Sequence, residues 1–365
     1  MRSALLEFER ATGDLASLLD RNKLEEQILS WSGNDPLPPE INELLVRYRR
    51  CVEPFSLRQA QYSMQLVLLY GAFERLIEGL LIGLADALSN VVPSFDQLPA
   101  RVRENHRRKS LDALRDEVWL SRQADPALAS RLIENLNSCE SRLSNYALNS
   151  PAYARHGANF RRAQIDEAFR ELDVSNLCVR AASTHHFRAY LDEEVRSAGL
   201  LDASLGAIDD LAERRNEIAH GSPSQLLNVD ELKGYLDFVR ALGRGAYTVL
   251  CQYVAQFVVG HHAQALGAIG KIHYLHVVCL DTGVLPEGTR MEVGDLIAMR
   301  NEGNSGFTLG EIRRLRLESG DVPSFRTQRG LEVCIETSIR LRETRDLYLV
   351  ARDNQTAIAL ARPLP

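Results

Sequence analysis

The sequence lacks the patterns that mark most metal, redox and nucleotide sites. Its six cysteines are scattered without a Cys-x-x-Cys pair, which excludes the common zinc and redox motifs and favours reduced thiols in a cytoplasmic protein. The glycine-containing turn at 302–306 has neither the Lys-Ser/Thr of a phosphate loop nor a G-x-G-x-x-G fingerprint. The adjacent pairs His185-His186 and His261-His262 point about 100° apart on a helix, so neither pair chelates one ion. We therefore expect no metal and no cofactor.

The chain also has little that would direct it to a membrane or to bulk nucleic acid. Acidic residues interrupt its first ten positions, where a signal peptide needs an unbroken apolar segment. The longest run without a charged residue, 245–270, contains glutamines and histidines and is typical of a buried helix. The net charge of −6 argues against indiscriminate binding to phosphate, so any RNA contact must be local. We expect a soluble cytoplasmic protein without membrane contact.

What the sequence does contain indicates two domains of different class. At 365 residues, with 45% apolar and 25% charged side chains, it is long enough for two folded units. Up to about residue 262, apolar residues recur at three- and four-residue steps, and breaks at 34–39, Pro93, Pro151 and 221–223 divide the pattern into eight or nine helices. After about 268, six or so short alternating runs predict a small closed β-barrel. The predicted fold is a helical domain over 1–264, with 1–50 as an extension, followed by a barrel over 268–365.

The most informative segment is Arg215-Asn216-Glu-Ile-Ala-His220, at the end of an apolar helical stripe. Gly221 follows and predicts the end of that helix, which puts His220 in the last turn. Arginine is permanently charged, and an imidazole exchanges protons near neutral pH. Together these groups suit the cleavage of a phosphodiester without a metal.

RNA supplies its own nucleophile, the 2′-hydroxyl, so an RNase needs groups that move protons and a positive charge at the phosphorane. His220 suits proton transfer, Arg215 suits the charge, and Asn216 can hydrogen-bond a phosphate. Arg215 and His220 are separated by about 140° around a helix and about 7.5 Å along it. One copy is therefore an incomplete site, and a symmetric homodimer would supply a second arginine and histidine.

The segment resembles the Arg-x4-6-His signature of HEPN ribonucleases, and more specifically their RiboL-PSP-HEPN branch. Segments 69–79, 156–160 and 230–238 support the resemblance, which covers most of residues 50–255. It implies an all-α HEPN helical bundle that dimerises around a composite, metal-independent endoribonuclease site and leaves a 2′,3′-cyclic phosphate. Arg215 and His220 inherit the catalytic roles, and Asn216 the accompanying polar role.

The same resemblance implies a toxin or antiphage-defence setting, with tRNA, rRNA or mRNA as substrate and an antitoxin or other defence protein as partner. Some HEPN domains are catalytically inactive, so the alternative is a scaffold that binds RNA or a partner protein.

Several residues outside the signature are candidates for supporting roles. Glu74 lies beside an apolar helical stripe and either pairs with a motif arginine, Arg214 among them, or is an ordinary surface charge. The run at 101–109 is the densest basic stretch, and its residues Arg107, Arg108 and Lys109 either contact an RNA backbone or form a solvated helix face.

The C-terminal runs 291–299, 310–317, 329–336 and 344–350 are similar in order to the second domain of translational GTPases such as elongation factor Tu. The resemblance covers about 268–352 and implies contact with RNA, the ribosome or a partner. A dimer-stabilising or antitoxin-contacting appendage is the alternative, and a translation-associated binding protein is a third possibility for the whole chain.

Overall fold

The computed structural model describes residues 1–30, 38–51, 53–141, 145–191, 201–221, 225–268, 272–274, 276–281, 287–301, 306–328, 332–342 and 345–350. Helices occupy the first part of the chain and strands the last, as predicted. The α-helices are α1 (Arg2–Ser30), α2 (Pro39–Cys51), α3 (Pro54–Val91), α4 (Ala100–Arg115), α5 (Glu117–Ser121), α6 (Leu128–Glu140), α7 (Ser150–Ala154), α8 (Arg162–Arg170), α9 (Leu177–Ala182), α10 (His185–Tyr190), α12 (Leu201–Ala219) and α13 (Val229–His262).

The described residues form twelve α-helices, more than the eight or nine predicted. The additional ones are short: α5 and α7 have five residues each, and α9 and α10 have six. Such helices complete fewer than two turns, so an apolar repeat of 3.6 residues cannot reveal them.

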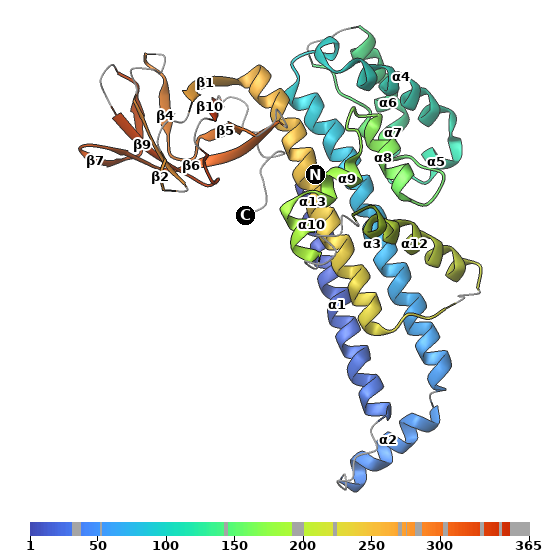
Figure 1. The fold of residues 1–365 in the computed structure, drawn as a ribbon. Coiled ribbons are helices and arrows are strands. Elements are labelled where there is room, and N and C mark those ends of the chain that lie inside the picture. The colour runs from blue at the N-terminus through green and yellow to red at the C-terminus, as the bar shows by residue number, and fades with distance from the viewer. Residues whose placement is uncertain are drawn as a thin grey trace.

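Three long helices, α1, α3 and α13, run side by side as a stem, with α2 at its lower end (Figure 1). Helices α4 to α8 form a lobe beside the upper end, and α12 packs against the middle of α3. Local sequence sets the starts of these helices. Glu53 accepts a hydrogen bond from the Phe55 N–H at the start of α3, and Asn228 and Glu231 form a reciprocal capping box at the start of α13.

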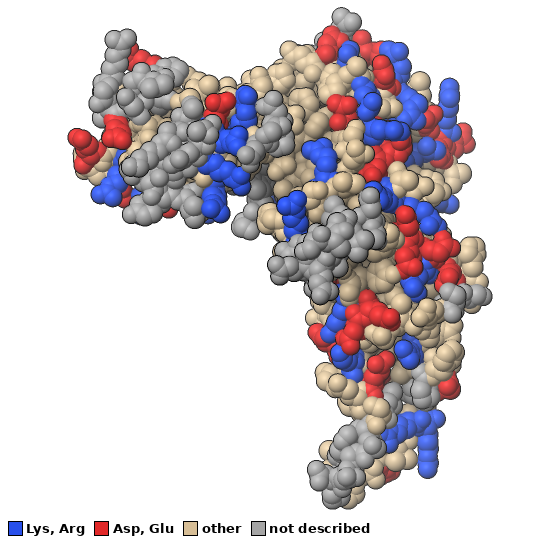
Figure 2. Space-filling model, in the orientation of Figure 1, with Lys and Arg blue, Asp and Glu red and all other residues tan. Residues whose placement is uncertain are grey.

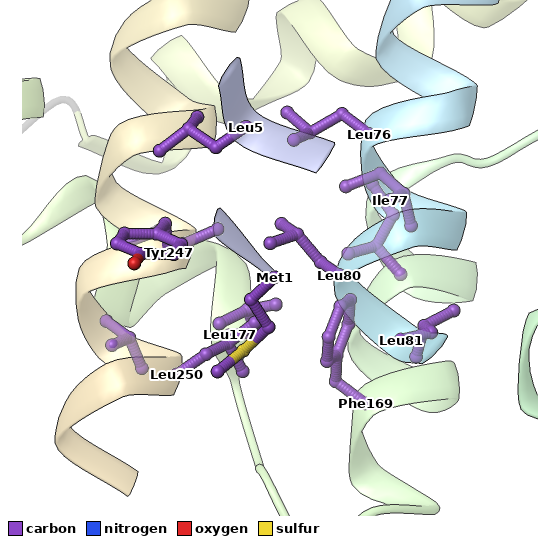
Figure 3. Packing of buried hydrophobic residues seen from close by; sticks show 14 of the residues in the cluster. Met1, Leu5, Leu76, Ile77, Leu80, Leu81, Phe169, Leu177, Tyr247 and Leu250 are labelled. Carbon is purple, nitrogen blue, oxygen red and sulfur yellow. The ribbon is translucent and has the colours of Figure 1, made fainter. Parts of the chain in front are cut away.

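The core of the stem is made by the apolar faces of α1, α3 and α13, with further side chains from α8 and α9 (Figure 3). Leu5, Leu80 and Leu250 are fully buried there. Helix α1 approaches α3 so closely that a Cβ atom added at Gly79 would lie 2.5 Å from the Cβ of Ala4. Only glycine fits at this crossing.

The strands are β1 (Ala263–Ala268), β2 (Ile272–Tyr274), β3 (Val277–Asp281), β4 (Arg290–Glu292), β5 (Leu296–Arg300), β6 (Phe307–Leu317), β7 (Gly320–Val322), β8 (Ser324–Arg326), β9 (Glu332–Thr337) and β10 (Asp346–Val350). The main sheet has the order β1-β10-β5-β6-β9-β3-β2, with β7 paired to β6, and β4 pairs with β8 separately. All these pairs are antiparallel.

The sheet is open within the described part of the chain, because its two end strands, β1 and β2, are not paired with each other there. The predicted barrel is therefore seen as an antiparallel sheet, and its closure stays a prediction. Residues 351–365 of the predicted barrel, and 302–305 of the turn at 302–306, lie outside the described residues.

The sheet has its own apolar core, which includes Val278, Ile297 and Ile335, and it is anchored to the stem. Strand β1 continues directly from α13, and Leu309 and Val350 join the apolar cluster of the helices. The chain changes from helix to strand at Ala263, and the predicted domain bounds, 1–264 and 268–365, stay a prediction.

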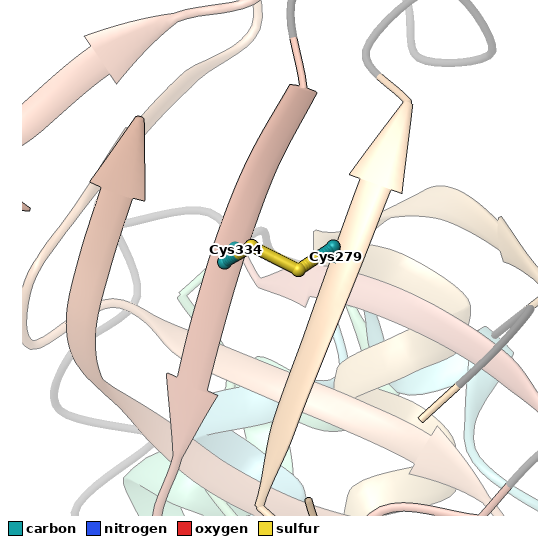
Figure 4. Close-up of a disulfide and its surroundings, with 2 residues drawn as sticks. All are labelled: Cys279 and Cys334. Atoms are coloured by element: carbon teal, nitrogen blue, oxygen red, sulfur yellow. A yellow bond between two sulfur atoms is a disulfide. The ribbon is translucent and has the colours of Figure 1, made fainter. Parts of the chain in front are cut away.

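Cys279 and Cys334 form a disulfide between β3 and β9, where the register places them directly opposite each other (Figure 4). The reading of all six cysteines as separate reduced thiols is therefore wrong for this pair. The cysteines lie 55 residues apart in sequence, and only the strand register brings them together. Cys51, Cys139, Cys178 and Cys251 carry free thiols.

The apolar run at 245–270 lies largely in α13, whose side chains there pack into the core. Among the described residues, no helix has both the length and the apolar character needed to cross a bilayer.

Candidate functional site

The Arg215–His220 segment lies at the end of α12, as predicted. Leu205, Ile208 and Leu211 bury the apolar face of this helix, with exposures of 0–1%. The helix ends at Ala219, and Gly221 follows with a φ of +77°, in the left-handed region that favours glycine. The Gly221 N–H donates to the Ile218 carbonyl at 3.0 Å, which closes the helix end. The motif thus lies at a helix end, where Ala219 and His220 are exposed.

Arg215 is half-buried and points toward α3. Its guanidinium carbon lies 5.9 Å from the centroid of the Tyr70 ring, a distance at which a cation is attracted to an aromatic face. Burial, followed by the nearby Glu74 carboxylate, raises the pKa of Tyr70 to about 12, so the ring stays neutral near neutral pH. The Tyr70 hydroxyl oxygen accepts a hydrogen bond from the Phe160 N–H at 2.7 Å. Tyr70 therefore links the motif arginine to the segment between α7 and α8.

Asn216 is held by the same segment. The side-chain amide of Asn159 donates a hydrogen bond to the Asn216 side-chain oxygen. Asn216 therefore has one acceptor position occupied within its own chain. The NH2 group of Asn216 is the donor that would contact a phosphate oxygen.

Glu74 is half-buried on α3, four residues after Tyr70. Burial raises the pKa of its carboxyl group, while the charge of His156 acts in the opposite direction. Its ion-pair partner is His156, whose Nε2 lies 4.0 Å from Glu74 Oε1, and Arg215 acts on it only as a nearby charge. The predicted alternatives are a pair with a motif arginine and an ordinary surface charge. Glu74 matches neither in full, because it is half-buried and its ion-pair partner is His156.

His156 is a site residue that sequence reasoning did not single out. Its Nε2 is 3.0 Å from Glu78 Oε1, and its Nδ1 is 2.8 Å from the Ala158 carbonyl oxygen. Both ring nitrogens thus face acceptors, which suits the doubly protonated imidazolium. The hydrogen bond to Glu78 is the main cause that raises the pKa of His156, against the effect of burial. The only sequence signal was its position in the family-like segment 156–160.

Arg214 neighbours Arg215 but has different partners. Its Nε donates to Asp210 Oδ2 at 2.7 Å, and the hydroxyl of Tyr235 on α13 donates to the same carboxylate. A second guanidinium nitrogen lies 3.4 Å from the Gln225 carbonyl oxygen. Arg214 therefore ties α12 to α13 and to the chain that follows the motif.

His220 is exposed, one residue beyond the end of α12. Its backbone N–H donates to the Asn216 carbonyl at 3.0 Å, while its imidazole makes no hydrogen bond or ion pair with a described residue. The exposed imidazole is therefore accessible to a ligand or a second chain.

The three residues of α4 that were predicted to contact RNA each lie against an acidic side chain. Arg107 makes a bidentate contact with Glu140, while Arg108 and Lys109 both contact Glu171. Figure 2 shows Lys and Arg interleaved with Asp and Glu over the helical part on this face. No described group of three or more His, Cys, Asp or Glu side chains is arranged to hold a metal ion.

A search of protein families matches the RiboL-PSP-HEPN profile to residues 21–252. The chain belongs to the RiboL-PSP-HEPN family. The match contains α3, α12 and most of α13, so Tyr70, Arg215 and His220 all lie within it. Searches of curated proteins and of solved structures return no match. The sheet lies outside the matched residues, and family membership indicates an RNA-directed nuclease or a scaffold.

Proposed function

We propose that the protein is a metal-independent endoribonuclease that cleaves RNA by attack of the 2′-hydroxyl on the adjacent phosphate. The observation that carries the proposal is the combination of an arginine that lies over a tyrosine ring with an exposed histidine at the end of the same helix. Arg215 is oriented by Tyr70, and His220 is exposed at the end of the same helix. Family membership extends this proposal to a role in defence or as a toxin, with an antitoxin or similar protein as the partner.

The reaction needs two proton transfers. A neutral His220 imidazole accepts the 2′-hydroxyl proton as the 2′-oxygen bonds to phosphorus. A protonated His220 from a second protomer donates a proton to the departing 5′-oxygen, which leaves a 2′,3′-cyclic phosphate. Arg215 stabilises the charge on the phosphorane, and the NH2 group of Asn216 donates to one of its oxygens. Glu74 and Arg214 act as positioning residues, through His156 and Asp210 respectively.

Dimerisation is part of this proposal, because one helix cannot bring both groups to one phosphate. On an ideal helix, two residues with the spacing of Arg215 and His220 point about 140° apart. The second candidate function is a non-catalytic scaffold that binds RNA or a partner protein, and it applies to any copy that stays monomeric, because the site of one copy is incomplete.

End-group analysis of cleaved RNA tests the proposed chemistry. Purified protein is incubated with single-stranded RNA in EDTA, and the products are examined by mass spectrometry for 2′,3′-cyclic phosphates. Dilution below the dimer dissociation constant should abolish cleavage if the site is composite. Ends that carry a 5′-phosphate and a free 3′-hydroxyl would contradict the mechanism.

Arg107, Arg108 and Lys109 are proposed as additional RNA contacts, and the sheet as an RNA-, ribosome- or partner-binding appendage. Each phosphate contact contributes about one unit to the slope of log affinity against log salt. An unchanged slope in the double variant Arg107→Glu, Arg108→Glu would remove α4 from the RNA footprint. Ribosome co-sedimentation of the full chain, with and without residues 268–365, tests the appendage.

A further inference from the structure

A pocket of about 340 Å³ lies beside the candidate site, between α4, the segment 155–160 and α8. Its volume is at the lower end of the range for small-molecule sites, about 300–1,000 Å³. It therefore has room for one small planar group, and not for a duplex or a folded peptide.

The lining of the pocket combines apolar and polar side chains. Ala158 and Ala163 contribute exposed apolar surface, while Phe160 lines the pocket with only 1% of its surface exposed. Lys109 and Gln164 also line the pocket and bring donors and, for the glutamine, an acceptor. A small apolar surface beside polar groups suits an unstacked nucleobase, which is recognised by contacts to its face and by hydrogen bonds to its edge.

Two cations that line the pocket are held in place by acidic partners. Lys109 Nζ lies 2.7 Å from Glu171 Oε2, and both side chains are largely buried, at 16% and 10% exposure. Arg155 Nε donates to Asp116 Oδ2 at 3.0 Å, which fixes the plane of a second cation in the wall. Donors that are already ordered lose less side-chain entropy when a ligand binds, which favours affinity.

The wall of this pocket is the segment that holds the motif. Its residues His156 and Phe160 line the pocket, and the intervening Asn159 donates to Asn216. Phe160 also donates its N–H to Tyr70, over which Arg215 lies. The pocket and the motif are therefore linked through one short segment.

We propose that this pocket is a subsite for one unpaired nucleotide of the RNA strand that flanks the cleaved phosphate. The inference rests on the proposed nuclease function for its substrate, and it names single-stranded RNA as the substrate class. A base in the pocket would lie against the segment that orients Arg215 and Asn216, so binding and alignment of the motif would be coupled.

Binding of a non-cleavable strand tests the subsite separately from catalysis. The probe is a fluorescein-labelled, fully 2′-O-methylated eight-nucleotide RNA, measured by fluorescence anisotropy with the full-length protein. Ala163→Trp fills the pocket from an exposed position on α8, and the expected loss of affinity is on the order of tenfold or more, as for loss of one stacked base. Gln164→Ala, which shortens a side chain, should instead reduce the preference among A, C, G and U homopolymers. Ala60→Trp, at an exposed position near the start of α3, is the matched control.

Equal affinities of the wild type and Ala163→Trp would overturn the subsite, even if the wild type cleaves RNA. Lost binding in Ala163→Trp, together with no cleavage by the wild type, would support the subsite and overturn the nuclease. Competition with the four nucleoside 5′-monophosphates separates an RNA subsite from a free-nucleotide site. Monophosphate binding that Ala163→Trp removes, with unchanged oligonucleotide binding, would contradict the proposal.

Discussion

The imidazolium of His156 should make the stability of the helical domain depend on pH in a defined direction. His156 lies between Glu78 at 3.0 Å and Glu74 at 4.0 Å, with Arg215 and Arg75 as further charges near Glu74. Its pKa is raised in the folded state, chiefly by Glu78. The stabilisation by His156 is therefore complete below its unfolded-state pKa of about 6.5. It is lost as the pH rises through the higher pKa of the folded state.

The magnitude follows from the exposure of the pair. A hydrogen bond to a charged group contributes about 1.5–3 kcal/mol when it is well shielded. The side chains of His156 and Glu78 are 26% and 37% exposed, so solvent screens the interaction. We expect about 1 kcal/mol for the pair.

Urea unfolding of the wild type and His156→Gln at several pH values tests this reasoning. Near pH 6, the variant should have a free energy of unfolding lower by about 1 kcal/mol, and the difference should shrink toward pH 9. His185→Gln, at an exposed position on α10, is the control and should show little change at either pH. A difference between wild type and His156→Gln that is constant from pH 6 to 9 would refute the role of the imidazolium.

Three further predictions concern the fold. Tyr70→Phe should lower the free energy of unfolding by about 1–3 kcal/mol, because the Phe160 N–H loses its acceptor; an unchanged urea midpoint would contradict this. Gly79→Val should cost about 1–3 kcal/mol by overpacking the crossing of α1 and α3. Gly234→Ala, where nothing lies within 4 Å of the added Cβ, should instead stabilise by about 0.5–1 kcal/mol, and equal effects of both variants on thermal unfolding would be inconsistent with this packing. Reductant should lower the stability of the sheet by about 2–4 kcal/mol in the wild type and leave Cys279→Ser unaffected, and non-reducing peptide mapping that finds both thiols free would exclude the disulfide.

The sequence predicted what depends on short-range pattern. The apolar stripe of α12 and its end at Gly221 follow from residues within one helix, and the structure confirms both. Strand β1, in contrast, exists through its pairing with β10, some 80 residues away. Such pairing is set by tertiary contacts that a local pattern does not contain.

The residues of the candidate site likewise divide into those that a local pattern indicates and those that tertiary contacts bring together. Arg215, Asn216 and His220 were identified from their spacing in one segment. His156 was missed because its carboxylate partners lie on α3, 78 residues away in the case of Glu78. The cross-strand pair Cys279 and Cys334 was missed for the same reason, since the register of β3 and β9 decides it.

The measurement that tests the central claim most directly is RNA cleavage by Arg215→Ala and His220→Ala in the presence of EDTA. The wild type should cleave single-stranded RNA, and each variant should lose activity by at least about a hundredfold, as for removal of one charge-stabilising or proton-transfer group. Arg188→Ala and His185→Ala, both at exposed positions on α10, should retain wild-type activity. Cleavage that persists in both motif variants, or a wild type that does not cleave RNA, would contradict the assignment.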